Sequence, residues 1–342
     1  MSELSLSLNI VIFAACAFIV AIAGTRMARL ADRLADLTGL GEALFGAVFL
    51  GAVTSLSGSV TSVTAAAGGA ASLAVSNAVG GIAAQTAFLV IADAAYPKTN
   101  LEHAAASSEN MLQAVLLIVL LSLPLTAALT PNYAVAGISP VTPIILFTYL
   151  YGLRLSRAMR EDPMWHPRKT RETRLDEPDE DEDSRSSTIW LMVEFAGLGV
   201  LLGLTGWAIA ETGSAISAAT GLSQTIMGAA FTAIATSLPE LVTTIAAVRQ
   251  GALTLAVGGI VGGNTFDVLF LVASDVAYRD GSIYHAVDNR DLFLFVWAIL
   301  MVGALVLGLV RRERHGFAGI GFEGVALLTI FAAGLGMQVL LG

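Results

Sequence analysis

Charged residues and cysteine are both scarce in this chain of 342 residues. Only 13% of the residues are charged, against about 25% in ordinary soluble domains, while 56% are hydrophobic. Cys16 is the only cysteine, so no intrachain disulfide can form. The chain also lacks a P-loop, a nucleophile elbow and a basic nucleic-acid patch. These absences argue against a soluble protein, an enzyme, ATP-driven transport and a nucleic-acid partner.

Long apolar runs are abundant. A helix that crosses a hydrocarbon core of about 30 Å needs roughly 20 apolar residues, whereas barrel strands alternate over about 10. The first run follows MSELSLSLNI, which has no basic region, so we expect a retained helix rather than a signal peptide. We predict an all-α membrane protein, held in a lipid bilayer by ten transmembrane helices. They are expected at 8–29, 42–67, 71–95, 111–130, 138–156, 189–211, 221–249, 252–277, 291–311 and 319–341.

Arginine and lysine predict the orientation of these helices, because cytoplasmic loops carry an excess of both. With the N-terminus outside, only Arg279 and Arg290 fall in outside loops, and all other basic residues fall inside. We therefore predict a multi-pass protein of the cell membrane with both termini extracytoplasmic. The 157–188 loop is then cytoplasmic, and its acidic run at 176–183 is typical of a solvated linker.

The two halves of the chain repeat each other. A shift of 182 residues places 46–96 on 228–278 without a gap, and 23 of the 51 aligned residues are identical. An odd number of helices per half makes the halves enter the membrane in opposite senses, which is typical of secondary transporters. We predict a first five-helix repeat at 1–156, the cytoplasmic linker, and a second five-helix repeat at 189–342.

Two carboxylates, Glu240 and Asp267, lie inside apolar runs of the second repeat. A carboxylate near the bilayer centre costs about 3 kcal/mol or more on insertion scales, so each indicates a functional site. Pro239 precedes the glutamate and four glycines (Gly258, Gly259, Gly262 and Gly263) precede the aspartate. We expect two interrupted helices there, because irregular backbone in a membrane lines protein-enclosed or watery cavities.

The sequence ATSLPELV at 235–242, followed by GGIVGGNTFD at 258–267, resembles the α-repeat of the sodium/calcium exchanger family. The family pattern is approximately G-T-S-L-P-E, then G-N-x-x-G-S-N-x-F-N/D. The resemblance implies a ten-helix inverted-repeat fold and a central cation site. The implied metal ligands are Glu240 and Asp267, with oxygens from Thr236, Ser237, Thr54, Ser55 and Gln85, and Asn264 lining the site.

The first repeat departs from this pattern. Ser57 and Gly58 stand where the family has proline and glutamate, and Gln85 matches Asp267. Two carboxylates still neutralise one Ca²⁺, although fewer charged ligands weaken a calcium site. The prediction is a secondary active cation antiporter that exchanges Ca²⁺ for Na⁺ or H⁺ by alternating access, without a covalently bound cofactor. The alternatives are a monovalent cation/proton exchanger of the same fold, and a non-transporting protein with a decayed first repeat.

Most other polar residues in or near the apolar runs are interpreted without a role in ion binding. Asp93 and Asp275 are expected at the membrane interface, with the lining of an entry path as the alternative. Glu194 is expected at the cytoplasmic interface, with a relay as the alternative. Asn77 and Asn264 lie within apolar runs, where either could bond across helices, and Asn264 could instead line the site. Glu42 and Glu323 fall near predicted helix ends and are expected to be solvated. The glycine pairs at 80–81 and 262–263 are expected to expose backbone at the site, with close helix packing as the alternative.

Overall fold

The computed structural model describes residues 4–38, 51–96, 99–165, 167–168, 188–314 and 321–341. Over these residues the protein is all-helical, and β pairing is limited to one isolated bridge between Val135 and Ile138. The helices of the first half are α1 (Leu6–Thr38), α3 (Leu56–Ala67), α4 (Ala71–Ala94), α5 (Leu101–Ala105), α6 (Ser108–Leu129) and α7 (Val141–Glu161). Those of the second half are α8 (Thr188–Thr220), α9 (Gln224–Ile226), the π-helix η1 (Met227–Thr232), α10 (Ala233–Thr236), α11 (Leu238–Gln250), α12 (Leu253–Ala277), α13 (Ile283–Ala286), α14 (Asn289–Arg311) and α15 (Phe322–Leu341).

Seven of the described helices are long and apolar enough to cross a membrane, and a bent pair, 224–236 with 238–250, makes an eighth candidate span. The seven are α1, α4, α6, α8, α12, α14 and α15. The prediction of an all-α, multi-pass membrane protein is therefore confirmed. Helix α7 is not among the candidates, and its C-terminal half carries Arg154, Arg157 and Arg160.

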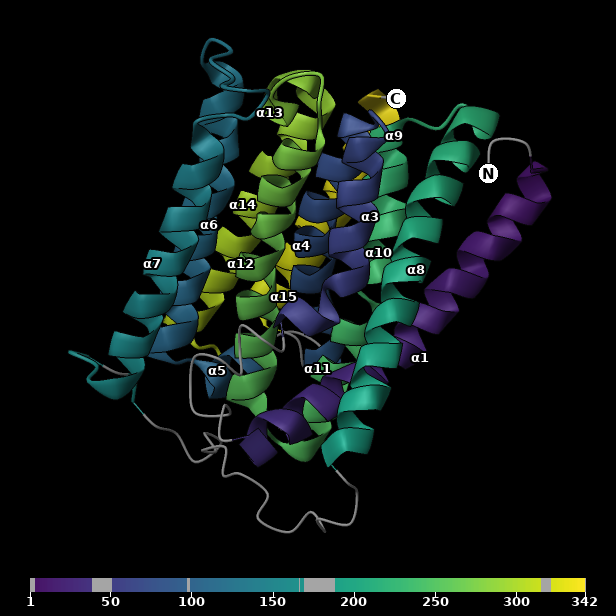
Figure 1. Cartoon of the computed structure of the whole chain (residues 1–342). Helices are drawn as coiled ribbons and strands as arrows, with labels where there is room; N and C mark the ends of the chain where they lie inside the picture. The colour runs from purple at the N-terminus through teal and green to yellow at the C-terminus, as the bar shows by residue number, and fades with distance from the viewer. Residues whose placement is uncertain are drawn as a thin grey trace.

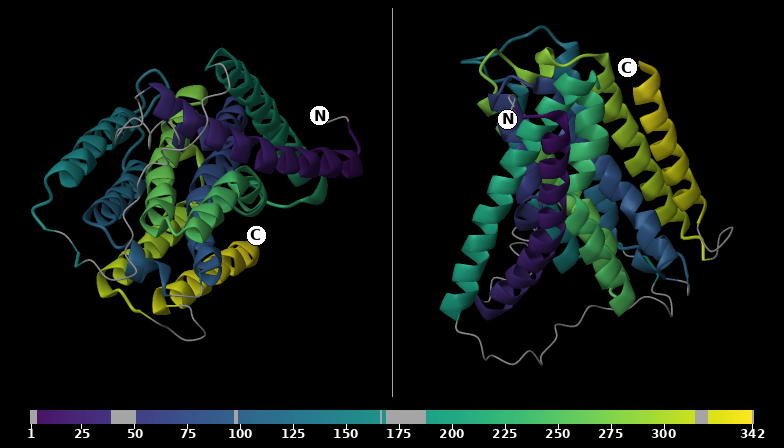
Figure 2. Two further views of the ribbon diagram at one scale, coloured as in Figure 1. Left: turned by 90° about the horizontal axis from the view of Figure 1, so that it is seen from below. Right: turned by 90° about the vertical axis from the view of Figure 1, so that its right-hand side faces the viewer.

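Helices α4 and α12 form the centre of the bundle. In the most apolar window of α4, 94% of the residues are buried, and in α12 61% are, against 22% in α1 and in α8. Figure 1 shows α6 and α7 on one side of this centre and the long, slanting pair of α1 and α8 on the other, and Figure 2 shows the same arrangement from below. A helix that is apolar all round is expected to be buried, as α4 is.

The ends of the helices follow a consistent order along the bundle. In Figure 1, α1 begins and α15 ends at the upper end, whereas α7 ends and α8 begins at the lower end. Helices α1 and α8 therefore run in opposite directions. We refer to the two ends below as the terminal end and the linker end.

Close approach between helices depends on glycine at a few positions. A Cβ atom at Gly80 of α4 would lie 2.5 Å from Cα of Ala229 in η1, and one at Gly206 of α8 would lie 2.5 Å from the Ser57 carbonyl oxygen. Small residues at such contacts let helix backbones approach each other, which favours association in a membrane.

The helices break at equivalent places in the two halves. Residues 51–54 and α3 are separated by a turn at Ser55, and α10 and α11 by a turn at Ser237, which matches Ser55 under the 182-residue shift. The segments 224–236 and 238–250, which contain α10 and α11, are bent by 47° relative to each other at this break. The expected interruption beside Glu240 is therefore present, with the π-helix η1 just before it.

The expected interruption beside Asp267 is wrong, because α12 is one continuous helix from Leu253 to Ala277. Its glycines serve packing instead. A Cβ atom at Gly258 would lie 2.9 Å from Oδ1 of Asn110, and one at Gly262 would lie 3.3 Å from Oε1 of Gln113, both on α6. Helix α6 thus packs along the glycine face of α12.

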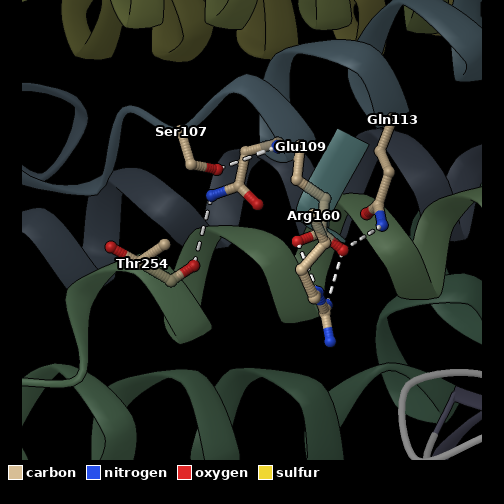
Figure 3. A network of polar contacts seen from close by, with 6 residues as sticks. Ser107, Glu109, Gln113, Arg160 and Thr254 are labelled. Atoms are coloured by element: carbon tan, nitrogen blue, oxygen red, sulfur yellow. Dashed lines mark hydrogen bonds and ion pairs between the residues drawn. The ribbon is translucent and has the colours of Figure 1, made fainter. Parts of the chain in front are cut away.

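Polar contacts hold α6 against α7 and α12 near the linker end (Figure 3). The guanidinium of Arg160 on α7 pairs with Glu109 on α6, with an Nε–Oε2 distance of 2.9 Å, and Gln113 donates to the same carboxylate at 3.4 Å. The next residue of α6, Asn110, donates through its amide to the Thr254 carbonyl of α12 at 3.2 Å. Arg160 therefore holds α7 against α6, whereas Arg157 pairs with Glu161 of its own helix.

Candidate functional site

The two acids predicted to hold a cation are both buried within the bundle. Glu240 is 6% exposed and lies in the first turn of α11, directly after the break at Ser237. The N-terminus of a helix favours a negative charge, so this position suits a carboxylate. Asp267 is 1% exposed and lies in the middle of α12, where its charge acts on that of Glu240.

Residues of the first repeat contact both carboxylates. The Ser55 hydroxyl, at the break before α3, donates to Oε1 of Glu240 at 3.5 Å, and Thr54 also hydrogen-bonds this glutamate. The Gln85 amide of α4 donates to Oδ2 of Asp267 at 2.7 Å. These predicted site residues come together from segments that are more than 180 residues apart in the chain.

Ser237 joins the same network, because the Gln85 amide also donates to its hydroxyl oxygen at 3.2 Å. Two other predicted residues contact different partners. The Thr236 hydroxyl donates to the Thr232 carbonyl of its own helical segment at 3.0 Å. The Asn264 amide donates to the Thr86 hydroxyl at 3.0 Å, which ties α12 to α4 beside the acids.

Three oxygens of the network are buried without a hydrogen-bond partner in the protein: Oε2 of Glu240, Oδ1 of Asp267 and Oε1 of Gln85. Most buried polar atoms in proteins are hydrogen-bonded, so such a group of orphaned acceptors calls for an explanation. All three are acceptors, which is the chemistry that a hard cation requires. Among the described residues, no group of three or more His, Cys, Asp or Glu is arranged to hold a metal, so the charge here comes from two carboxylates.

The glycines beside the site provide room rather than exposed backbone. Gly81 lies inside α4 and Gly263 inside α12. A Cβ atom at Gly81 would lie 3.5 Å from the Ser237 hydroxyl oxygen, and one at Gly263 would lie 3.6 Å from Oε1 of Gln85. The expectation of exposed backbone is therefore wrong for these positions. Close packing, the alternative, describes the other member of each pair, Gly80 against η1 and Gly262 against α6.

One feature of the site was missed from the sequence. The Phe270 ring of α12 fills the space beside Gly58, since a Cβ atom there would lie 2.9 Å from Cε2 of this ring. Gly58 matches Glu240 under the repeat, so an aromatic ring stands where a second glutamate would fit.

Asn77 links the repeats, because its amide donates to the Gly58 carbonyl at 3.2 Å and accepts from the Thr232 hydroxyl at 2.7 Å. This contact agrees with the expectation that an amide within an apolar run bonds across helices.

The remaining acids lie away from this site. Glu194 is partly exposed and pairs with Arg26 at 2.7 Å, which joins α8 to α1. Asp93 and Asp275 lie near the ends of α4 and α12, as expected, and both are buried within the protein. Glu323 is also fully buried rather than solvated. Glu42 lies outside the described residues.

If the two acids hold a transported cation, as the sequence resemblance implies, replacing Gln85 with leucine should weaken the binding of that cation. The substitution removes the donor that contacts Asp267 at 2.7 Å, and a hydrogen bond to a charged group contributes about 1.5–3 kcal/mol. We expect the apparent affinity for the transported cation to fall about 10-fold or more, measured from the concentration dependence of uptake. Gln338→Leu is the control, because Gln338 is also a buried amide but bonds the Arg290 carbonyl on α14, and it should leave the affinity unchanged.

The profile of the family described as sodium/calcium exchanger protein matches residues 8–156 and 190–340, which is most of the chain. The putative antiporter CaxA of Alkalimonas amylolytica is 31% identical over 157 residues, which cover 45% of each protein. The sodium/calcium exchanger MaX1 of Methanosarcina acetivorans is 28% identical over 113 residues, 33% of this chain and 30% of MaX1. The chain thus aligns with less than half the length of these curated relatives.

Solved structures share the fold over nearly the whole chain. A structure of the sodium-calcium exchanger NCX_Mj aligns with a TM-score of 0.57 and 16% identity, over 97% of this chain and 99% of that one. The H⁺/Ca²⁺ exchanger CAX aligns with a TM-score of 0.69 and 13% identity, over 97% and 86% of the two chains. At these identities the likeness shows the fold alone.

Proposed function

The chain belongs to the sodium/calcium exchanger family, a family of cation/calcium antiporters, and from this premise we propose that it exchanges Ca²⁺ for Na⁺ or H⁺ across the membrane. Membership makes it a transporter rather than an enzyme. The transported ions, the path of the chain through the bilayer and the roles of individual residues belong to the proposal.

The observation that carries the proposal is the meeting of Glu240 and Asp267 with Ser55 and Gln85 inside the bundle. Two carboxylates neutralise one Ca²⁺, and Ca²⁺ takes six to eight oxygen ligands. The orphaned oxygens of Glu240, Asp267 and Gln85 would supply ligands, and the hydroxyls of Ser55 and Ser237 lie in the same network. This convergence argues against the non-transporting alternative, which predicts acids that face lipid or lie far apart.

The architecture that we propose has ten transmembrane helices in two inverted five-helix repeats, 1–156 and 189–342. Helical residues occupy the described part of every segment predicted to span, including 51–67 and α7. Helices α1 and α8, which begin the two repeats, run in opposite directions (Figure 1). The two breaks, at Ser55 and Ser237, lie at equivalent positions. A site between inverted repeats permits alternating access by movement of one helix group against the other.

The orientation follows from the basic residues. The linker end carries the arginines of α7, and cytoplasmic loops are enriched in arginine and lysine. We therefore place the 157–188 loop in the cytoplasm and both chain ends outside the cell membrane. The start of α1 and the end of α15 at the opposite end of the bundle agree with this placement (Figure 1).

A monovalent cation exchanger is the second candidate, and Phe270 is the observation that favours it. Its ring occupies the space beside Gly58, so the first repeat contributes an amide and hydroxyls but no carboxylate. Fewer charged ligands lower the affinity for Ca²⁺ more than that for Na⁺, because the divalent ion gains more from each charge.

Flux into proteoliposomes tests the proposal. Uptake of radioactive Ca²⁺ is measured against an outward Na⁺ gradient and, in a parallel arm, against a pH gradient. Uptake that requires one of the gradients supports calcium exchange and identifies the counter-ion. The absence of Ca²⁺ uptake in both arms, from protein that is shown to be folded, would contradict it, and Na⁺/H⁺ exchange in the same vesicles would support the monovalent candidate.

A further inference from the structure

A second group of buried acids lies at the linker end, remote from the candidate cation site. Asp93 ends α4, Glu102 lies on the short helix α5, and Glu323 lies in the first turn of α15. They are 2%, 2% and 0% exposed. We call these three residues the linker-end acids. Charged groups are rarely buried unless they are paired, so their environment must compensate three negative charges or prevent them from forming.

Only some of the carboxyl oxygens of the linker-end acids have hydrogen-bond partners in the protein. Oδ1 of Asp93 accepts the Leu101 backbone N–H at 2.7 Å, and Oε1 of Glu323 accepts the Asn100 amide at 3.2 Å. The carboxyl groups of Glu102 and Glu323 lie close enough to share a hydrogen bond when one of them carries a proton. The second oxygens of all three carboxyl groups, Oδ2 of Asp93 and Oε2 of Glu102 and of Glu323, are buried without a partner.

Glycines make room for this arrangement. A Cβ atom at Gly308 of α14 would lie 2.5 Å from Cγ of Glu323, and one at Gly321 would lie 2.3 Å from the Asn100 amide nitrogen. The Glu323 side chain is therefore held against α14 rather than turned toward water.

We call the segment that joins α4 to α5 a corner. The second repeat contains the equivalent corner, which joins α12 to α13, and there both carboxyl oxygens of the aspartate have hydrogen-bond partners. Asp275, which matches Asp93, accepts the Ile283 backbone N–H eight residues further along the chain, just as Asp93 accepts that of Leu101. Oδ2 of Asp275, however, accepts the Ser139 backbone N–H at 2.8 Å and the Thr142 hydroxyl. The equivalent oxygen of Asp93 has no partner, so the two corners differ.

The next residue shows the same difference. Tyr284 follows Ile283 and accepts the Thr142 hydroxyl at 3.3 Å, which is a neutral contact. Glu102 follows Leu101 and contacts the Glu323 carboxyl instead. The acidic pair is therefore a feature of one repeat alone, and the general fold of the corner does not require it.

Nearby basic groups have other contacts. Arg312 donates to the His103 carbonyl and to the Arg168 carbonyl. Arg311 lies over the Phe322 ring at 5.5 Å, and its positive charge also acts on Glu323. The ion pairs described elsewhere in the structure, such as Arg160 with Glu109, do not involve the linker-end acids. Burial raises the pKa of Glu102, which lies outside the spans, well above its usual value, and the charges of Glu323 and Asp93 add to this. Among the described residues, the other titratable or charged groups in the chain segments beside the cluster are Tyr96, His103, Arg311, Arg312, Glu313 and Arg314.

We propose that the linker-end acids form a proton-binding site, in which Glu102 carries the proton and donates it to Glu323, so that α5 is held against α15. A metal ion fits less well, because no three acids or histidines among the described residues are placed to ligate one. The proton is taken from water as the pH falls and returned as it rises, with no other change in bonding. The site is independent of the proposed transport, since none of its residues contacts Glu240 or Asp267.

Thermal unfolding of the full chain in detergent, measured against pH, tests this site. A carboxyl group whose pKa is higher in the folded chain than in the unfolded chain stabilises the fold at low pH. This stabilisation is lost as the pH rises from the unfolded-state pKa, about 4.3, through the folded-state pKa. We expect the melting temperature to fall over this window. Glu102→Gln, which keeps the donor and cannot ionise, should reduce this slope and melt several degrees higher at the alkaline side. Every variant is compared in a Glu240→Gln background, which removes the ionisation of that residue.

Tyr284→Phe is the matched control from the other repeat, and it should keep the slope of the parent. An infrared band of a protonated carboxylic acid that disappears in Glu102→Gln would identify the proton directly. An unchanged slope and an unchanged band would refute the site. Stabilisation by added Ca²⁺ that Glu102→Gln abolishes would show a metal site and overturn the proton assignment. If Glu102→Gln does not fold, Glu323→Gln replaces the other member of the pair and tests the same slope.

Discussion

Glu240→Gln should abolish cation exchange while leaving the protein folded. Glu240 contributes one of the two carboxylates of the site and lies 6% exposed at the start of α11. Two unit charges about 4 Å apart interact by about 4 kcal/mol at an effective dielectric constant of about 20, which corresponds to a change in binding on the order of 1,000-fold. The amide keeps the size of the side chain but places a donor where the cation needs an acceptor.

The measurement is Ca²⁺ or Na⁺ flux into proteoliposomes, together with the melting temperature of the same preparation. Because burying a charge is costly, the neutral variant should melt at the same temperature or higher, which separates lost transport from misfolding. Glu194→Gln is the control, since this partly exposed acid pairs with Arg26 away from the site and should transport normally. Full activity of Glu240→Gln would remove Glu240 from the proposed mechanism.

Gly80→Ala should destabilise the contact between the two repeats. The added methyl group would lie 2.5 Å from Cα and 2.9 Å from the carbonyl oxygen of Ala229 in η1. Both are backbone atoms, so the methyl fits only if α4 and η1 move apart. Overpacking of this kind costs about 1–3 kcal/mol. Transport should fall as well, because the same helix positions Gln85 at the site.

The matched control is Gly259→Ala on α12, where an added Cβ atom meets nothing within 4 Å. Both substitutions gain the same intrinsic helix propensity, about 1 kcal/mol, so the difference between the two melting temperatures isolates the contact with Ala229. Equal melting temperatures would show that η1 accommodates the methyl and that the close approach is not required.

The class of protein and the location of its chemistry could be predicted from the sequence, because the signals are large. Apolar runs of the required length identify spans, and two carboxylates inside such runs are too costly to be incidental. The repeat also related Ser55 to Ser237, and the structure breaks its helices at both. Only the break at Ser237 has a proline beside it, because Pro239 lies near the start of α11 and Ser57 stands at the equivalent position beside Ser55.

Other features depended on the tertiary structure. The glycines before Asp267 weaken a helix in isolation, but α12 is continuous because α6 packs along them. Asp93 and Glu323 lie at the ends of their helices, yet both are buried by neighbours that arrive from distant parts of the chain. The partners of the central acids, and the ring of Phe270 beside Gly58, are likewise set by packing.

The physical reason is the same in each case. Lipid tails are as apolar as a leucine side chain, so hydrophobicity marks which segments enter the membrane but not which face of a helix meets lipid and which meets protein. By itself the sequence determined the membrane class, the repeat and the two central acids of this protein. Only the tertiary structure decided which residues face those acids and which of the remaining acids are buried, because those outcomes depend on helix packing rather than on local composition.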